Sequence, residues 1–498
     1  MLTAGFTQAY FDDPETSNAS SATAWTSALW TQTSQADFGA GVLSNVNTTL
    51  SANDVILSAG GSAGGANMIL FWDGGGAPTD WTCISDDSGE AFYQKFIRGE
   101  AAYGGTGGAV THTHTASATS PTAGPSATTN TRSGATAFSN QTHTQTVTGF
   151  SATVATASNL PSYRSLKVIR YDGGGIPSII PLGAIAIFDT TLPSGWTRYS
   201  LEDNYLVRGD ASVAAGGSDT HTHNLTGITY TIGANTATIT SATNSTTTAV
   251  ATGNHAHSVG ATTATTASAS NVPPYVTVVL AKADSATTVP LGMIAMFDAS
   301  PTDNWSVLSN SGGAFYQKFI QGNTTFGSNG GGDNHTHTNL TITTGAPSAT
   351  ANARTNGADG TYVGSSAHTH NITVPFSTTA NVLPPYVNVI FAKALYASSG
   401  TIASQVLNTS VTGARWDGLG WDSTLPAGTG ITFEVRASDT VFLKTDGSPS
   451  WTAVGGASPV IVSLPSGRYK QWRATLTPDV PRTSTPTLHE VRVYYYGN

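Results

Sequence analysis

The stretch that decides the fold is GDASVAAGGSDTHTHNLTG, residues 209–227, in which a glycine-rich turn leads to the pair His221 and His223. A second pair, His255 and His257, follows after a long run of Thr, Ser, Ala and Asn. In a β-strand, residues i and i+2 share one face and lie roughly 6.5–7 Å apart. Two imidazoles at this spacing can reach one metal ion, so the sequence predicts metal-binding β-structure.

The same layout occurs three times, with a period of about 110 residues, which is typical of an internally repeated architecture. Each copy opens with an apolar strand, passes a tryptophan, reaches a strand that ends in glycine, and closes on a proline-tyrosine strand. The first copy is degenerate at its second pair, where His143 is followed by Gln145. The intact pairs, which are the candidate metal ligands, are His112/His114, His221/His223, His255/His257, His335/His337 and His368/His370.

The repeats divide the chain into five segments. An N-terminal β segment, residues 1–54, is too short for a robust core and is expected to lean on a neighbour. The three repeats occupy 55–172, 173–285 and 286–396. Residues 397–498 contain strictly alternating strands such as ITFEVRAS, which predict an antiparallel β-sandwich able to fold by itself.

Composition and charge exclude several classes of protein. Only 10% of the residues are charged, and the net charge is -9, so no basic cluster is available to bind nucleic acid. No run of 18 apolar residues is present, so no membrane span is expected. The first 20 residues lack the basic and apolar regions of a secretory signal, and the lone Cys83 rules out an intrachain disulfide framework. These features favour an all-β fibrous protein assembled inside a cell.

The order of motifs resembles that of phage tail-collar domains and the tips of tail fibres. The matching motifs are LGAIAIFD at 182–189, PSGW at 193–196, Arg-Gly at 208–209, GGSDTHTH at 216–223 and PPYV at 273–276. The resemblance implies an elongated, intertwined homotrimeric fibre in which His-x-His motifs of three chains bind Fe(II) or Zn on the threefold axis. It also implies a place in the virion tail, extracellular after release. The expected partners are other tail or baseplate proteins and a host-surface glycan or protein.

The residues themselves leave other interpretations of the histidine pairs open. Six neutral imidazoles favour iron or nickel over zinc, which usually takes four ligands. The two pairs of one copy could instead form a four-histidine zinc site, or the rings could stack with threonine and bind nothing. A carboxylate from Asp219 or Asp333, each just before a pair, could contribute. A cupin-like catalytic site needs a glutamate a few residues later, and none of the intact pairs has one.

We therefore expect a structural and adhesive virion component, a tail-collar fibre held together by metal, and no enzyme activity. The alternative is a cellular surface filament or adhesin subunit built from the same repeats. Trp81, Trp196 and Trp305 recur at one position of the repeat, where a core anchor is favoured over a sugar-binding platform. Most of the four tryptophans after residue 399 are expected to be buried as well.

Overall fold

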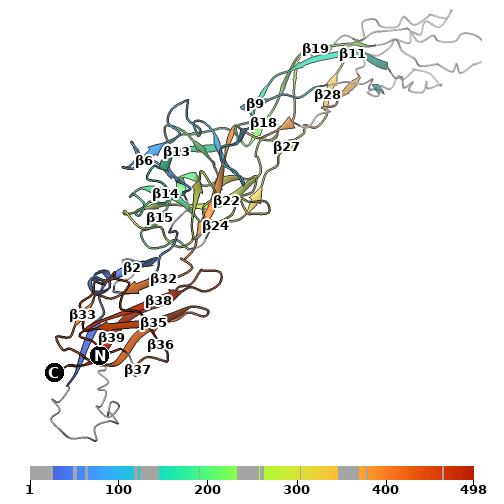
Figure 1. Cartoon of the computed structure of the whole chain (residues 1–498). Helices are drawn as coiled ribbons and strands as arrows, with labels where there is room; N and C mark the ends of the chain where they lie inside the picture. The colour runs from blue at the N-terminus through green and yellow to red at the C-terminus, as the bar shows by residue number, and fades with distance from the viewer. Residues whose placement is uncertain are drawn as a thin grey trace, which may run out of the picture.

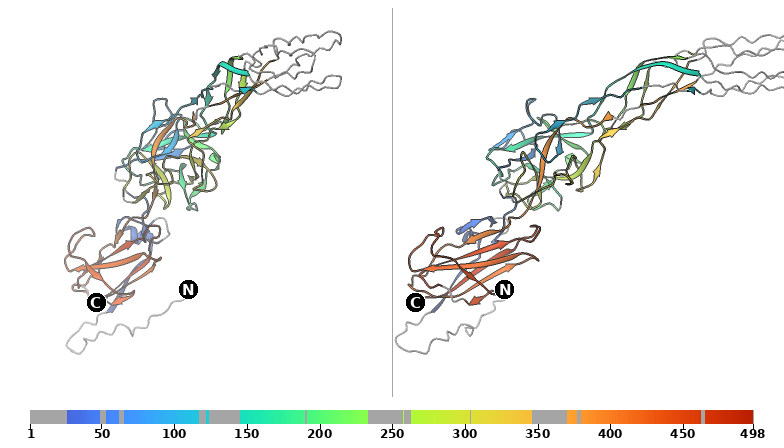
Figure 2. Two further views of the ribbon diagram at one scale, coloured as in Figure 1. Left: turned by 90° about the vertical axis from the view of Figure 1, so that its right-hand side faces the viewer. Right: turned by 45° about the vertical axis from the view of Figure 1, so that its right-hand side comes forward.

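The computed structural model is an elongated, almost entirely β molecule (Figure 1). It describes residues 26–48, 53–61, 65–116, 122–123, 145–189, 191–232, 257, 263–302, 304–345, 370–376, 380–461 and 465–497. A β-sandwich forms one end, the strands of the three repeats form a compact body in the middle, and a narrow region with β11, β19 and β28 extends beyond it (Figure 2). Within the described ranges no helix is both long and apolar enough to cross a membrane.

Residues from both ends of the sequence build the sandwich. One sheet has the order β1 (Thr26–Gln32), β39 (Thr487–Gly497), β34 (Trp416–Thr424), β37 (Val460–Ile461). The other has the order β2 (Val42–Ser44), β32 (Gly400–Ala403), β38 (Tyr469–Thr477), β35 (Gly430–Ser438), β36 (Thr452–Val454), with β33 (Leu407–Asn408) also on β38. A short helix, α1 (Gln35–Gly39), and the hairpin of β3 (Val46–Asn47) and β4 (Ile56–Leu57) complete it.

The N-terminal segment therefore belongs to the same sandwich as the C-terminal strands. Strand β1 pairs antiparallel with β39 along its whole length, and β2 pairs with β32. The indole N–H of Trp472, which is fully buried, donates to Oε1 of Gln32 at 2.7 Å. Ala59 and Tyr396 form a β-bridge where the chain leaves and re-enters the sandwich. The three repeats are consequently an insertion between strands of one sandwich.

The three repeats contain corresponding strands. In the first they are β5 (Met68–Trp72), β6 (Trp81–Cys83), β7 (Phe96–Gly99), β8 (Thr106–Gly107), β9 (Thr111–His112), β10 (Thr122–Ala123), β11 (Gln145–Val154), β12 (Ala157–Ser158) and β13 (Tyr163–Tyr171). The second has β14 (Ala184–Phe188), β15 (Trp196–Arg198), β16 (Leu206–Gly209), β17 (Ala215–Gly216), β18 (Thr220–His221), β19 (Asn224–Ile232), β20 (Thr263–Thr265), β21 (Ala269–Ser270) and β22 (Tyr275–Ala283), with a 3-10 turn, η2 (Ser200–Glu202). The third has β23 (Met293–Phe297), β24 (Trp305–Val307), β25 (Phe319–Gly322), β26 (Asn329–Gly330), β27 (Asn334–His335), β28 (Leu340–Thr343), β29 (Asn371–Val374), β30 (Ala380–Asn381) and β31 (Tyr386–Ala394).

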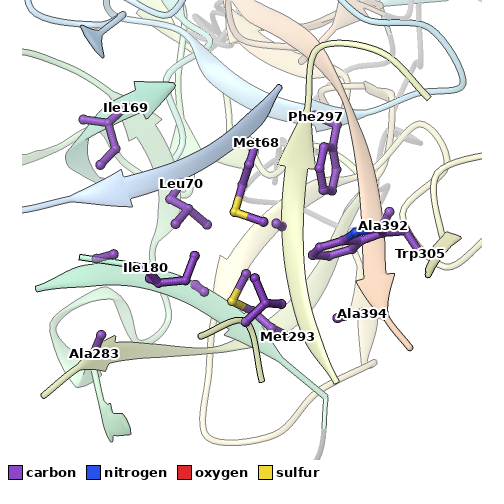
Figure 3. Close-up of a cluster of buried hydrophobic side chains, with 14 of the residues drawn as sticks. Met68, Leu70, Ile169, Ile180, Ala283, Met293, Phe297, Trp305, Ala392 and Ala394 are labelled. Atoms are coloured by element: carbon purple, nitrogen blue, oxygen red, sulfur yellow. The ribbon is translucent and has the colours of Figure 1, made fainter. Parts of the chain in front are cut away.

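The opening strands of the repeats meet around a common pseudo-threefold axis. Each of β5, β14 and β23 pairs with both of the others. All five residues of β14 and of β23 are buried, which explains why these strands are apolar without alternation. Figure 3 shows Met68, Leu70 and Met293 converging in this core, with Trp305 beside Phe297. The recurring tryptophans are core residues, as the sequence predicts, and are 5–7% exposed.

The repeats interlock through their closing strands. The first half of each closing strand runs parallel to the glycine-ended strand of the next repeat: β13 with β16, β22 with β25, and β31 with β7. The register is the same each time, with Tyr163 opposite Leu206, Tyr275 opposite Phe319, and Tyr386 opposite Phe96. Because the third repeat pairs with the first, the ring is closed within one chain.

The glycine that ends each of these strands is required by a close approach of backbone. A Cβ on Gly99 would lie 2.1 Å from the carbonyl oxygen of Phe315, and one on Gly209 would lie 2.4 Å from that of Phe92. At Gly322 the corresponding distance is 2.3 Å, to the carbonyl oxygen of Glu202. The Arg-Gly and Gln-Gly motifs of the sequence thus mark the contact between neighbouring repeats.

Ion pairs between repeats follow the same threefold symmetry at two of its three equivalent positions. Lys282 pairs with Asp73 at 2.8 Å, and Lys393 pairs with Asp189 at 2.7 Å. At the equivalent position the first repeat has Arg170 in place of a lysine, and Arg170 instead pairs with Asp172 of its own repeat at 3.4 Å. The third aspartate, Asp298, accepts hydrogen bonds from the backbone and side chain of Asn67, where the chain enters the body. The entry of the chain therefore makes one of the three seams different.

Candidate metal centre

In each repeat the first histidine of the first pair lies on a short strand at the neck of the molecule, where the body narrows (Figure 1). Strands β9, β18 and β27 each pair antiparallel with a strand later in the same repeat. The residue opposite His112, His221 and His335 is an alanine each time, Ala157, Ala269 and Ala380. A small side chain at this position leaves room for the imidazoles on the axis.

The closed ring of repeats brings these three pairs together. One potential ligand nitrogen from each of the six rings lies within 4.8 Å of all the others. Four of the rings are nearly or fully buried, with exposures of 3% for His114, 0% for His223, 9% for His335 and 5% for His337. The six residues are His112, His114, His221, His223, His335 and His337.

The spacing between the nitrogens matches an octahedral metal site. Nε2 of His335 lies 3.1 Å from Nε2 of His112 and 3.0 Å from those of His114 and His221. Nε2 of His223 lies 3.0 Å from Nε2 of His112. In an octahedron with metal–nitrogen distances of about 2.1 Å, adjacent nitrogens are about 3.0 Å apart and opposite ones about 4.2 Å. Both distances fall within the 4.8 Å limit of the cluster.

Backbone carbonyls hold two of the rings in the orientation that a metal requires. Nδ1 of His223 lies 2.7 Å from the carbonyl oxygen of Ala155, and Nδ1 of His337 lies 2.8 Å from that of Ala267. A carbonyl only accepts, so each Nδ1 carries the proton and each Nε2 presents a lone pair. Each carbonyl belongs to the repeat before that of its histidine, so these bonds also link neighbouring repeats.

Hydrogen bonds between the rings cannot satisfy all the ring nitrogens of this cluster. Nε2 of His223 presents a lone pair to Nε2 of His112, and Nε2 of His337 is buried without a hydrogen-bond partner. Nε2 of His335 faces three other Nε2 atoms, although a neutral imidazole has one N–H in total. A bound cation would satisfy all six lone pairs at once. The donor set therefore fits a transition metal ion.

Five of the six rings favour the neutral form. Burial first, and then the neighbouring imidazoles, lowers the pKa of His112 to about 4 and the pKa values of His221 and His335 to about 3. Burial likewise lowers the pKa values of His223 and His337, against the opposing effect of their carbonyl partners. Neutral imidazole is the form that binds metal, so the site is ready to do so near neutral pH.

Two of the other candidate ligands, His257 and His370, also lie close to each other. Their ring centroids are 4.6 Å apart, so one histidine from the second pair of repeat two lies beside one from the second pair of repeat three. Their companions His255 and His368 lie outside the described residues, as does His143. No carboxylate belongs to the six-residue cluster among the described residues; Asp219 accepts a hydrogen bond from the backbone N–H of Ser162.

The sequence predicted these six histidines as candidate metal ligands, and the resemblance grouped each pair with the same pair of two other chains. In the structure one chain supplies all six, one pair from each of its three repeats. The grouping joins the first pairs of different repeats; it does not join the two pairs of one repeat. The signal in the sequence for a centre within one chain was the number of repeats, because a threefold centre needs three copies. The contacts of the Ala155 and Ala267 carbonyls could not be predicted from the sequence, because every residue has a backbone carbonyl.

Comparison of the chain with protein-family models, with curated proteins and with solved structures found no match. The functional argument therefore depends on the geometry of the centre and on the motifs of the repeats.

Proposed function

We propose that the protein is a structural and adhesive component of a virion, a tail-collar fibre protein whose three repeats are held together by one transition metal ion. The observation that carries the proposal is the convergence of six imidazoles from corresponding positions of three repeats. Such a centre binds together segments that are far apart in the sequence. Its location at the neck, where the body narrows, is where a slender structure has least apolar core to hold it.

The ion we propose is Fe(II), with Zn as the alternative. Imidazole suits both metals, but six nitrogen ligands favour iron, because zinc usually binds four. All six positions of an octahedron would be filled by protein, which leaves no position for a substrate or an activated water. The proposed role of the ion is therefore structural, and no catalysis is proposed.

One chain is sufficient to complete this centre. The homotrimer that the sequence led us to expect is not needed to bring six imidazoles together, because the three repeats take the place of three chains. We propose one ion per chain at this centre. A homotrimer with axial ions shared between chains is the competing arrangement, and the two differ in ion count and in particle mass.

The adhesive role follows from the shape and from the motifs. The sandwich and the histidine neck lie toward opposite ends of the molecule, so one end can dock on the particle while the other reaches outward (Figure 2). The partners we propose are tail or baseplate proteins on one side and a host-surface glycan or protein on the other. None of the sandwich tryptophans is proposed as a sugar platform. Trp472 and Trp416 are buried, Trp421 stacks on Phe433, and Trp451 lies 4.5 Å from the guanidinium groups of both Arg436 and Arg473.

Elemental analysis combined with light scattering tests the proposal. The purified full chain should contain iron or zinc, and replacing His112 and His114 by alanine should remove one ion per chain. A matched control is His489→Ala, because His489 lies in the sandwich beside Asp54. Unchanged metal in the double variant would exclude the centre. Labelling of virions with an antibody to the chain, viewed by electron microscopy, separates a tail fibre from a cellular surface filament.

A further inference from the structure

Each repeat contributes one corner of the proposed metal centre, which consists of its first histidine pair and the strands that hold this pair. The three corners differ at one buried position. Four residues before the tyrosine that opens each closing strand, the first repeat has Asn159, the second has Asn271 and the third has Val382. Their backbone N–H groups make the same hydrogen bond, to the carbonyl oxygens of Val110, Asp219 and Asp333 at 2.7, 2.7 and 3.0 Å. The three side chains therefore occupy equivalent places.

All three side chains are buried beside the strand that carries the first histidine. Asn159 is 2% exposed, Asn271 is 1% exposed and Val382 is 1% exposed. Each follows by two residues the alanine paired with His112, His221 or His335, so it lies on the same face of its strand as that alanine. The apolar valine fits this environment without cost, whereas a buried amide needs hydrogen-bond partners.

The polar atoms left over at these corners are complementary. Oδ1 of Asn159 and Oδ1 of Asn271 are buried without a hydrogen-bond partner. Nδ1 of His112 and Nδ1 of His221 are buried and unpartnered in the same way. Asn159 also acts as a hydrogen-bonding neighbour of His112, in the direction that raises the pKa of that ring against burial. Leaving a buried acceptor and a buried donor unpaired costs free energy, so a small movement that joins them is favoured.

We propose that Asn159 and Asn271 are positioning residues of the metal centre, and that Val382 leaves the third corner without one. Each asparagine Oδ1 accepts the Nδ1 proton of its histidine when metal is bound, which directs the Nε2 lone pair of His112 or His221 to the ion. Nδ1 of His335 is buried without a partner, and the valine cannot supply one. The ring of His335 is therefore less firmly oriented than those of His112 and His221, and metal release begins with the loss of this ligand. This inference rests on the proposed metal-binding function.

Variants exchanged between the corners test the inference, because each residue already occurs at an equivalent place. In the full chain, Asn159→Val combined with Asn271→Val should weaken binding of Zn²⁺ about 10- to 100-fold, measured by competition with a chelator. Val382→Asn should strengthen it and slow metal release. Asn159→Asp, which keeps an acceptor, should restore binding that Asn159→Val loses. The Co²⁺-loaded protein should show altered ligand-field bands in the valine variant and restored bands in the aspartate variant.

The outcomes separate this inference from the proposal beneath it. A wild-type chain that binds no Zn²⁺, Fe²⁺ or Co²⁺ would overturn both. Wild-type binding with unchanged affinity and unchanged Co²⁺ spectrum in the double valine variant would overturn the inference and keep the metal centre. Thermal unfolding in a chelator gives the stability of the metal-free variants. A double variant that is destabilised there, yet binds metal as tightly as wild type, would show that the asparagines only support the fold.

Discussion

Tyr386, at the start of the third repeat's closing strand, lies opposite Phe96 of the first repeat in parallel register. This pairing closes the ring of three repeats, and the six histidines converge because the ring is closed. Phe96, Leu206 and Phe319 are 0–1% exposed where the three seams meet. The proposed metal centre and the closure of the ring should therefore stabilise each other.

Removing the metal should lower the stability of the repeats and spare the sandwich. A ligand that binds only the folded state adds about 4 kcal/mol when its free concentration is about 1,000 times its Kd. We predict that a chelator shifts the unfolding transition of the repeats to lower temperature in differential scanning calorimetry, while the transition of the sandwich stays in place. The His112→Ala/His114→Ala variant should show the same low transition with or without chelator. Equal transitions for the wild-type chain in both conditions would count against a structural ion.

Adding a methyl group at the seam glycines should open the ring. Gly99→Ala would place a Cβ 2.1 Å from a backbone carbonyl oxygen, which cannot move without displacing the neighbouring repeat. We predict a loss of about 1–3 kcal/mol or more in the free energy of unfolding of the repeats, measured by urea denaturation. Gly75→Ala is the matched control, because a Cβ there meets nothing within 4 Å. A Gly99→Ala variant as stable as Gly75→Ala would contradict the proposed seam.

The sandwich should need its N-terminal strands. Residues 397–498 alone lack β1, β2 and the hydrogen bond that the indole N–H of Trp472 donates to Gln32. We predict that this fragment shows little cooperative unfolding. A chain in which a short Gly/Ser linker replaces residues 60–395 should fold, because Ala59 and Tyr396 already form a bridge. Circular dichroism during heating distinguishes the two. A sharp transition of the isolated fragment at the same temperature would show that the N-terminal strands are dispensable.

The sequence predicted the local structure of the repeats better than their connections. Alternation in YVTVVL, the Arg-Gly motif and the spacing of His221 and His223 are local signals, and they identified the strands and the histidines that cluster in the structure. Which strand pairs with which depends on contacts between residues far apart in the chain, such as Tyr386 with Phe96 and Thr26 with Gly497. Periodicity records which face of a strand is buried and carries no information about the partner strand. The assignment of ligands to three chains rested on the resemblance, and the sandwich boundary rested on the change of composition.

One buried carboxyl group breaks the threefold pattern and gives a pH-dependent prediction. Glu202 occupies in the second repeat the position of Phe92 and Phe315, as the equivalent contacts of Gly322, Gly209 and Gly99 demonstrate. Glu202 is 0% exposed, and both of its carboxyl oxygens lack a hydrogen-bond partner. Burial raises its pKa from 4.5 to about 8, against the opposing effect of Arg164, whose Nε lies 3.7 Å away, and with a smaller contribution from Asp203.

The sign of the effect follows from where the proton is held. Between the ordinary pKa of 4.5 and the folded value of about 8, the folded chain keeps a proton on Glu202 that the unfolded chain has released. Raising the pH through this window therefore lowers the free energy of unfolding, by up to about 1.4 kcal/mol per pH unit, and the loss levels off above pH 8. We predict that Glu202→Gln and Glu202→Phe remove this slope and stabilise the repeats at pH 8. The measurement is urea denaturation at a series of pH values, with the wild-type curve subtracted so that all other titrating groups cancel. A difference between wild type and Glu202→Gln that stays constant from pH 5 to pH 9 would show that the buried carboxyl does not titrate in this range.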